Sequence, residues 1–436
     1  MLFKLFVTLS LLLLRLDAQE SKIQKELYLK PPLSKTQLEK KREGDYFTGM
    51  PLLNYDADKG IGYGARVYLY NNGKRDETLF NYTPYRHKIY LQYFETTNGY
   101  SNHKLFLDSK YIADSLFHLN AELIYEKNTQ ANYFGVGAST LSRLTDTQNN
   151  SYKTASAQQK ALDAQNSPYF NNYLLTQPKL ALNLSRDFLG GLVRLNVGTI
   201  IEYATLKDYH TTTLSKKYNA ESKLYNDREE LIGANGGWDN GLKLSFVYDS
   251  RDYAPNPKNG SLFDFSTLFY GDFLGSDFTH QRYTLSLRHF KQVPNAKFIT
   301  VALSALYSLQ QGDTPFYNQN SIDFSDDFTT GLGGQETLRG YTQNRFVADV
   351  KALANLELRF NLYENSLFGQ SFEYMFVPFL DSGKVFNSLE KSDLKGYKYS
   401  YGAGLRVAWN QATIIMLDYG VSVEDSGLYI NFGHIF

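Results

Sequence analysis

The sequence contains 436 residues, among them 35 Tyr, 30 Phe and 32 Gly, and it has no Cys. Because 45 Lys and Arg residues balance 45 Asp and Glu residues, the formal net charge is zero, and nothing predicts a nucleic-acid partner held by bulk electrostatics. The absence of cysteine excludes a disulfide framework, a thiolate metal site and lipidation of an N-terminal cysteine.

The first residues have the organisation of a secretory signal peptide. Lys4 supplies a positive charge, and an apolar run follows from Leu5 to Leu14. This run is too short for a membrane-spanning helix, which needs about 18 residues, and no later run reaches that length. We therefore predict an exported protein whose signal peptide is residues 1–18.

A polar segment follows the predicted signal peptide. Residues 19–50 are rich in Lys and Glu and contain the pair Pro31-Pro32. Such a composition is typical of a flexible lead-in. We expect residues 19–59 to form a short periplasmic N-terminal segment, too short for a substantial folded domain.

From Gly60 onward, apolar and polar residues alternate repeatedly. In residues 348–362 every even-numbered residue is apolar, whereas the odd-numbered ones are mostly polar. The mean hydropathy of −0.40, despite the many aromatic residues, shows that the apolar residues are dispersed. Soluble β-sandwiches also alternate. However, many of these segments reach about ten residues, the length that crosses a bilayer at a tilt, whereas soluble strands average about five or six.

We therefore predict an all-β protein, a transmembrane antiparallel β-barrel of sixteen strands over residues 60–436. The predicted strands are 60–71, 86–98, 102–112, 115–126, 132–141, 171–187, 190–205, 240–250, 259–273, 278–292, 296–310, 347–362, 372–383, 399–409, 412–420 and 427–436. The long predicted connections fall on one side, which we expect to be extracellular: 72–85, 142–170, 206–239, 311–346 and 384–398. An even strand count and loops that are long on one side are typical of outer-membrane barrels.

Three features go beyond the general barrel pattern. Residues 333–341 read Gly-Gly-Gln-Glu-Thr-Leu-Arg-Gly-Tyr within the longest late loop, and residues 376–383 read Phe-Val-Pro-Phe-Leu-Asp-Ser-Gly on a later strand. Between them, Glu357 lies on the polar face of its predicted strand. Taken alone, Arg339 could be a solvated loop residue, and the two acids could simply line a wet lumen.

Together, these features resemble the BamA/TamA outer-membrane assembly superfamily, also called the bacterial surface antigen family. The resemblance implies that the sixth extracellular loop folds into the lumen, where its arginine meets an acidic residue on each of the next two strands. Here Arg339, completed by Gly340 and Tyr341, matches the loop motif, and Glu357 and Asp381 match the acids. Phe379 and Gly383 match the supporting positions of the second acid's motif. A guanidinium can bridge two carboxylates at once.

Weaker matches extend the resemblance. Residues 50–64 are similar to the family's start of the first strand, and Asp249, Arg251 and Asp252 are similar to its periplasmic turn motif. Either could also be ordinary turn chemistry. The terminal Phe436, on a strand with other apolar residues, resembles the outer-membrane signature read by the assembly machinery, although an ordinary closing strand could also end this way. Residues 19–59 cannot hold a POTRA module, which puts substrate capture by such modules in doubt.

We expect no enzymatic activity, no cofactor and no metal, because the sequence lacks the nucleophile, phosphate-binding and metalloprotease motifs. The leading hypothesis is an outer-membrane barrel, with its N-terminus periplasmic, that assists insertion or translocation of proteins or lipids. It would work through a labile seam between the first and last strands, where Gly60, Gly62 and Gly64 would weaken the first strand. Its expected partners are outer-membrane lipid and, during biogenesis, the barrel assembly machinery. The alternative is a passive pore or surface-structural barrel.

Overall fold

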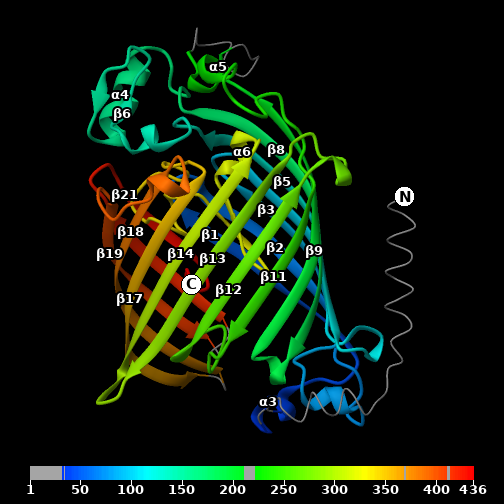
Figure 1. Cartoon of the computed structure of the whole chain (residues 1–436). Coiled ribbons are helices and arrows are strands. Elements are labelled where there is room, and N and C mark those ends of the chain that lie inside the picture. The colour runs from blue at the N-terminus through cyan, green and yellow to red at the C-terminus, as the bar shows by residue number, and fades with distance from the viewer. Residues whose placement is uncertain (1–31, 34, 211–220, 368–369, 410–412) are drawn as a thin grey trace.

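A computed structural model describes residues 32–33, 35–210, 221–367, 370–409 and 413–436. The predicted signal peptide, residues 1–18, lies outside these residues. One antiparallel sheet closes into a barrel of tilted strands. The large connections lie at one end of the barrel, and the first described helix, α3 (Lys35–Lys40), lies at the other (Figure 1). Among the described residues, no helix is long and apolar enough to cross a membrane.

Sixteen long strands pair with their neighbours in chain order. They are β1 (Asp45–Asp56), β2 (Gly60–Asn71), β3 (His87–Thr96), β4 (Tyr100–Ser109), β5 (Phe117–Asn132), β8 (Asn172–Phe188), β9 (Val193–Lys207), β11 (Gly241–Asp249), β12 (Asn259–Tyr270), β13 (His280–Val293), β14 (Ala296–Gly312), β17 (Val350–Leu367), β18 (Gln370–Phe386), β19 (Lys398–Trp409), β20 (Thr413–Val421) and β21 (Ser426–Phe432). The two-residue strand β10 (Gly237–Trp238) joins the same sheet beside β9. The pairing of β1 with β21 closes the barrel.

The two ends of the barrel differ in the size of their connections. We call the end with the largest ones the loop end; its elements are η3 (Ala138–Leu141), β6 (Leu144–Thr145), β7 (Ser151–Tyr152), α4 (Ala155–Ala164), α5 (Lys223–Asp227), η6 (Asp272–Leu274), α6 (Phe316–Gln319), β15 (Ser321–Asp323), β16 (Phe328–Thr330) and η7 (Leu389–Lys391). The opposite, turn end carries α3 (Lys35–Lys40), η1 (Thr78–Asn81), η2 (Ile112–Asp114) and η4 (Leu189–Gly191). The sixth connection at the loop end, residues 313–349, contains α6, β15 and β16 and is called loop 6.

The structure confirms the sixteen-stranded antiparallel barrel but corrects its first strands. The barrel begins at Asp45, because β1 occupies residues that the sequence analysis placed in the N-terminal segment. The predicted strand 132–141 is wrong: β5 ends at Asn132, and positive φ angles at Gly135 and Gly137 turn the chain into the loop before η3. One missed strand therefore offsets one false strand. Consequently the connection 72–85, predicted to be extracellular, lies at the turn end beside α3 (Figure 1).

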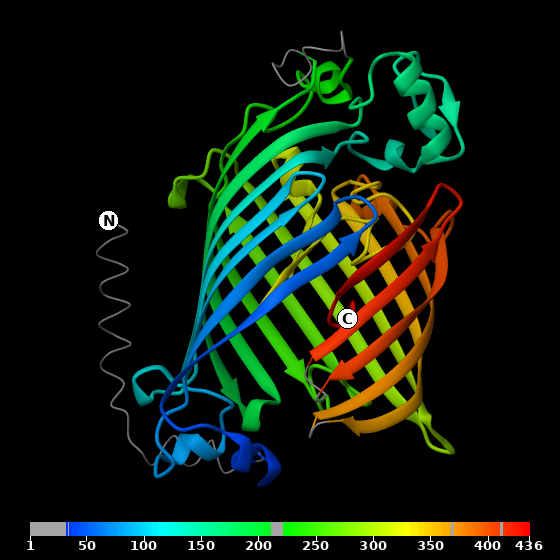
Figure 2. The same cartoon turned by 180° about the vertical axis from the view of Figure 1, so that it is seen from behind.

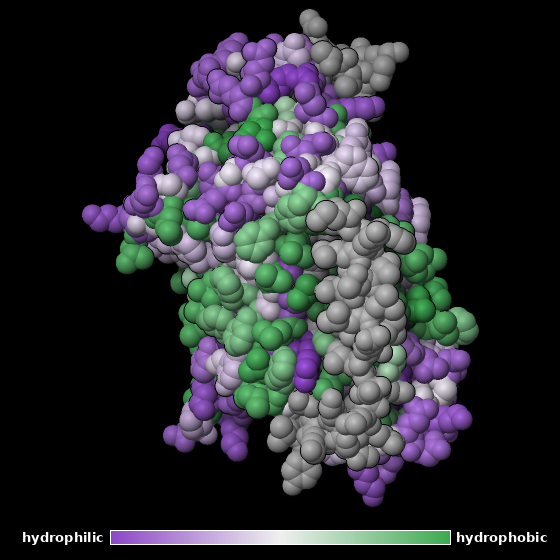
Figure 3. Space-filling view, turned by 45° about the vertical axis from the view of Figure 1, so that its right-hand side comes forward, coloured by the Kyte–Doolittle hydropathy of each residue, from purple (hydrophilic) through white to green (hydrophobic). Residues whose placement is uncertain are grey.

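The outer wall of the barrel is apolar. Four adjacent strands present side chains that are about half exposed or more: Val67 at 52%, Leu91 at 64%, Leu105 at 47% and Leu123 at 54%. Figure 3 shows hydrophobic residues over the middle of the barrel wall and hydrophilic residues towards both ends. A continuous apolar belt of this kind is typical of a surface that faces lipid.

Loop 6 folds into the barrel interior. Its residues Leu332, Leu338 and Phe346 are fully buried and pack against Leu353 and Val385 of the wall. Inward-facing wall residues are otherwise mostly polar, so the loop supplies apolar packing inside a polar lumen. This packing places the predicted arginine motif against the strands that follow the loop.

Candidate functional site

The tip of loop 6 is a compact turn that presents Arg339 to the wall. Gly333 and Gly340 have φ angles of +115° and +85°, which other residues adopt only with strain. The hydroxyl of Thr337 accepts a hydrogen bond from the Gly333 amide and donates to the Gly331 carbonyl. These hydrogen bonds within loop 6 stabilise the turn that carries Arg339.

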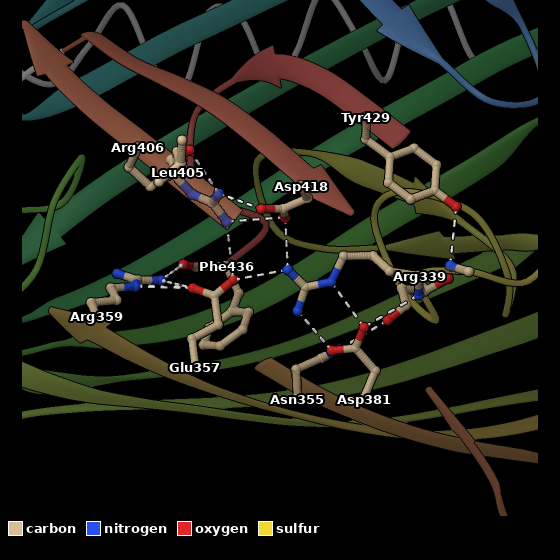
Figure 4. Close-up of polar contacts among 12 residues, drawn as sticks. Arg339, Asn355, Glu357, Arg359, Asp381, Leu405, Arg406, Asp418, Tyr429 and Phe436 are labelled. Atoms are coloured by element: carbon tan, nitrogen blue, oxygen red, sulfur yellow. Dashed lines mark hydrogen bonds and ion pairs between the residues drawn. The ribbon is translucent and has the colours of Figure 1, made fainter. Parts of the chain in front are cut away.

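Arg339 contacts both predicted acids. Its Nε and Nη2 donate to the two carboxylate oxygens of Asp381 on β18 at 2.9 and 2.8 Å, and its Nη1 lies 3.1 Å from Glu357 on β17 (Figure 4). The guanidinium also lies 3.3 Å from the ring centroid of Phe379. Arg339, Glu357 and Asp381 are all fully buried. The geometry is thus a bidentate pair plus a second carboxylate, a set of contacts that lysine could not reproduce.

The same guanidinium reaches a third carboxylate that the sequence analysis did not identify. Nη1 of Arg339 donates to Asp418 of β20 at 2.8 Å. Arg406 also donates to Asp418, and Arg359 lies 2.9 Å from Glu357. The described network therefore holds three guanidinium groups and three carboxylates (Figure 4).

This balance explains how the network can be buried. Each charge faces an opposite one, and Asn355 adds a hydrogen bond of 2.9 Å to Asp381. Isolated buried charges would be very unfavourable, whereas paired and hydrogen-bonded ones are tolerated. Arg406 and Asp418 are buried on the inner side of β19 and β20, and no sequence motif marked them.

Gly340 and Tyr341 attach the loop tip to the last strands. The amide of Gly340 donates to the Tyr429 hydroxyl of β21 at 3.1 Å. A Cβ at Gly340 would lie only 2.8 Å from backbone atoms of Gly420 and Val421, so glycine is required for this close approach. Tyr341 is 2% exposed and packs in the apolar cluster of loop 6.

Gly383 also belongs to this packing. A Cβ at Gly383 would lie 3.1 Å from a methyl group of Leu332, so a larger residue would push against the loop tip. The supporting motif residues Phe379 and Gly383 therefore both contact loop 6.

The barrel closure is short. Among the described residues, β1 and β21 share one residue pair, Tyr55 with Ile430, whereas β1 pairs with β2 along its whole length. Figure 2 shows the first strands, in blue, and the last strands, in red, on this side of the barrel. Loop 6 contacts both sides of this seam, because the Gln343 amide donates to Asp58 in the β1–β2 turn at 2.9 Å. Desolvation and the nearby Asp56 raise the pKa of Asp58 to about 7.

The glycines expected to weaken the seam lie elsewhere. Gly60, Gly62 and Gly64 belong to β2, which pairs on both of its edges with β1 and β3. The seam strand is instead β1, which contains Gly49 and Pro51.

Phe436 lies outside the last strand, which the sequence analysis wrongly extended to residue 436. The strand β21 ends at Phe432, and Gly433, with φ +98°, turns the following residues inward. Phe436 is 9% exposed and packs against Phe290 and Ala302. Its carbonyl accepts a hydrogen bond of 3.1 Å from Arg359, so these residues end at the buried charge network.

The predicted turn motif forms a separate unit at the turn end. Arg251 donates to both carboxylate oxygens of Asp249 at 2.9 and 2.7 Å. The carboxylate of Asp252 accepts bonds from the amides of Lys258 and Asn259, both at 3.0 Å. These contacts close the turn between β11 and β12 upon itself.

The lumen keeps open space beside loop 6. A cavity of about 1020 Å³ is lined by residues of β1, of loop 6 and of the segment after β21. Within the described residues, no cluster of three or more His, Asp or Glu side chains could hold a metal ion. The candidate site thus consists of the buried charge network and the adjoining lumen cavity, which reaches β1 at the seam.

Comparison with known proteins identifies the family. The model of the Omp85 superfamily domain matches residues 117–436, well over half of the sequence. The chain belongs to the Omp85 superfamily. This confirms the resemblance drawn from the loop motif and its acidic partners. A second model, a domain of unknown function (DUF5982), matches residues 24–86 and thus includes β1 and β2 of this Omp85 barrel.

Solved structures share the fold of this Omp85 protein. BamA from Haemophilus ducreyi, in a form lacking POTRA domains 1–3, is 13% identical, with a TM-score of 0.55 over 90% of this chain and 70% of that one. CdiB from Escherichia coli is 10% identical, with a TM-score of 0.54 over 91% of this chain and 68% of that one. No curated protein matches the sequence.

Proposed function

We propose that this Omp85 barrel assists the insertion or translocation of proteins at the bacterial outer membrane, without enzymatic chemistry. The observation that carries the proposal is the seam, because residues 45–54 of β1 have no strand partner on their second edge among the described residues. An open edge offers unpaired backbone N–H and C=O groups to another chain. The family resemblance in the loop motif supports a role in outer-membrane assembly.

The two faces of β1 next to the seam suit a client polypeptide that pairs with its open edge as an additional strand. On the outer side, β1 exposes Phe47 at 73%, next to the apolar belt. On the inner side, Leu52 and Asn54 line the lumen cavity. A polypeptide pairing with β1 would therefore have lipid on one side and water on the other, as an amphipathic barrel strand requires.

Loop 6 would hold β17 to β21 together as one rigid part of the wall when the seam opens. Arg339 joins three strands of the wall that ends at the seam, namely β17, β18 and β20. This latch consists of Arg339, Gly340, Tyr341, Glu357 and Asp381, supported by Phe379 and Gly383. With the latch closed, β17 to β21 would move as one body when the seam opens.

We further propose that the loop end faces the cell exterior and that the N-terminus and the turn motif face the periplasm. Long loops on the outer side and short turns on the inner side support this orientation. Outer-membrane lipid would contact the apolar belt, and the cell's barrel assembly machinery would insert the protein during biogenesis. We expect no nucleic-acid partner.

A deletion strain tests the proposal. If the protein assists insertion, unassembled outer-membrane proteins will accumulate and reintroduction of the intact gene will remove them. Planar-bilayer conductance of the purified protein provides the complementary measurement. A large steady conductance with no accumulation of unassembled proteins would instead support a passive pore.

A further inference from the structure

The first half of loop 6 is attached to a different wall from the one that holds Arg339. Asn318, in α6, is 4% exposed. Its side-chain amide donates to Glu202 of β9 and, at 2.7 Å, to Asp239 in the connection before β11. One neutral side chain thus bridges two buried carboxylates.

Cations complete this second cluster. Arg282 of β13 donates to the backbone carbonyl of Asn318 at 2.8 Å and forms an ion pair with Asp323 of β15. Lys179 of β8 lies 3.3 Å from Glu202. The cluster therefore spans β8, β9 and β13, and none of its members belongs to the Arg339 network.

Apolar contacts reinforce the same attachment. Phe316 and Tyr317 of α6 are 3% and 2% exposed and pack with Tyr173, Leu175 and Ala204 of β8 and β9. Farther along the loop, Ser325 donates to Asp264 of β12 from its backbone amide at 3.1 Å and from its hydroxyl. The α6 half of the loop thus has its own polar and apolar anchors.

We infer that Asn318 is a positioning residue that fastens loop 6 to the β8–β13 wall independently of Arg339, so that loop 6 braces two opposite walls of the barrel. The inference rests on the proposed function in one respect: a brace matters for activity only if the β17–β21 wall moves. The two separate attachments of loop 6, through Asn318 and through Arg339, do not depend on that activity.

Asn318→Asp is the most informative change. It removes an amide that donates to Glu202 and Asp239 and places a third carboxylate beside these two buried ones, so that like charges repel one another. Asn318→Ser removes the same bonds without adding charge and is the milder variant in case the first does not fold. Gln319→Ala is the matched control, because the Gln319 side chain bonds to Asp349 within the same loop.

Spin-label distances in the full-length protein in detergent micelles test the inference. The protein has no cysteine, so labels can be placed at will. One label replaces the exposed Asp327, which reports on the α6 half, or the exposed Glu336, which reports on the Arg339 half. The second label replaces Leu123 on the outer wall.

Two separate attachments predict a crossed pattern. Asn318→Asp or Asn318→Ser should broaden the distance distribution from position 327 and leave that from position 336 narrow, whereas Arg339→Ala should do the reverse and Gln319→Ala should change neither. The inference would be overturned if the Asn318 variants left position 327 unchanged, or if Arg339→Ala broadened both distributions equally. Because these distances need no client protein, the result is independent of the deletion-strain assay.

Discussion

Nη1 of Arg339 lies 2.8 Å from Oδ2 of Asp418, a carboxylate on β20, the strand before the last. This contact extends the latch beyond the two strands that follow loop 6. Because Gly340 also bonds to Tyr429 of β21, the loop tip contacts both of the final strands. The loop therefore stabilises the part of the barrel that borders the seam.

Loss of the loop arginine should strongly destabilise the barrel. Arg339→Ala leaves three buried carboxylates with two arginines, and breaking such a buried pair costs about 3–5 kcal/mol. Arg339→Lys should cost less, because it retains the charge but loses the bidentate geometry. Urea unfolding in micelles measures both. Arg75→Ala, at a side chain 57% exposed, is the control and should leave the unfolding midpoint unchanged. An unaltered midpoint for Arg339→Ala would rule out the latch.

Charge balance, more than any single contact, should govern the network. Asp418→Asn alone leaves an excess positive charge, and so does the loss of any one carboxylate. Adding Arg406→Gln to Asp418→Asn restores two cations against two anions. The double variant should therefore be more stable than the sum of the single effects predicts, with a coupling of about 0.5–3 kcal/mol between the positions. Additive effects in a double-mutant cycle would contradict this interpretation.

Gly340 should resist substitution more than a glycine that has the same backbone conformation in open space. Gly340 and Gly44 have φ angles of +85° and +70°, so alanine costs about 1–2 kcal/mol at either for the left-handed conformation. Only at Gly340 would the new Cβ meet backbone atoms, at 2.8 Å. Gly340→Ala should therefore lower the unfolding midpoint more than Gly44→Ala does. Equal shifts would show that the loop tip does not press against β20.

The contact of loop 6 with the β1–β2 turn should depend on pH. Because the pKa of Asp58 is raised from 3.8 to about 7, the folded protein retains this proton where the unfolded chain loses it. The resulting stabilisation is complete below pH 3.8 and is lost as the pH rises through 7. Asp58→Asn can still accept the Gln343 bond but carries no charge. This variant should match the wild type near pH 4 and be more stable at pH 8; identical pH profiles for the two proteins would refute the assignment.

Much of the wall could be predicted from alternation, because one side of each strand faces lipid and the other faces water. The pattern failed where it was short or interrupted. In β1, Gly49 and Pro51 resemble turn residues, yet proline is acceptable on an edge strand that needs no N–H donor on its open side. Tyr133, Phe134 and Val136 make this segment look like a strand, but β5 ends at Asn132 and the positive φ angles of Gly135 and Gly137 turn the chain into the loop.

The site could be predicted in part. A motif with a family resemblance indicated Arg339, Glu357 and Asp381, which the structure places in direct contact. Asp418, Arg359 and Arg406 were missed because a polar residue on an inward face is common in a wet lumen, and only the fold shows which of them meet. Asn318 was missed for the same reason, since its partners lie more than 70 residues away in the sequence.

Closing the seam covalently tests the central claim most directly. Tyr55 and Ile430 are the paired residues of β1 and β21, so Tyr55→Cys with Ile430→Cys should form a disulfide that locks the barrel. Leu91→Cys with Leu105→Cys, on the paired strands β3 and β4, is the matched control. In the deletion strain, the oxidised seam pair should fail to prevent accumulation of unassembled outer-membrane proteins, and reduction should restore this ability, while the control pair remains active throughout. Full activity with the seam verifiably crosslinked would contradict the account.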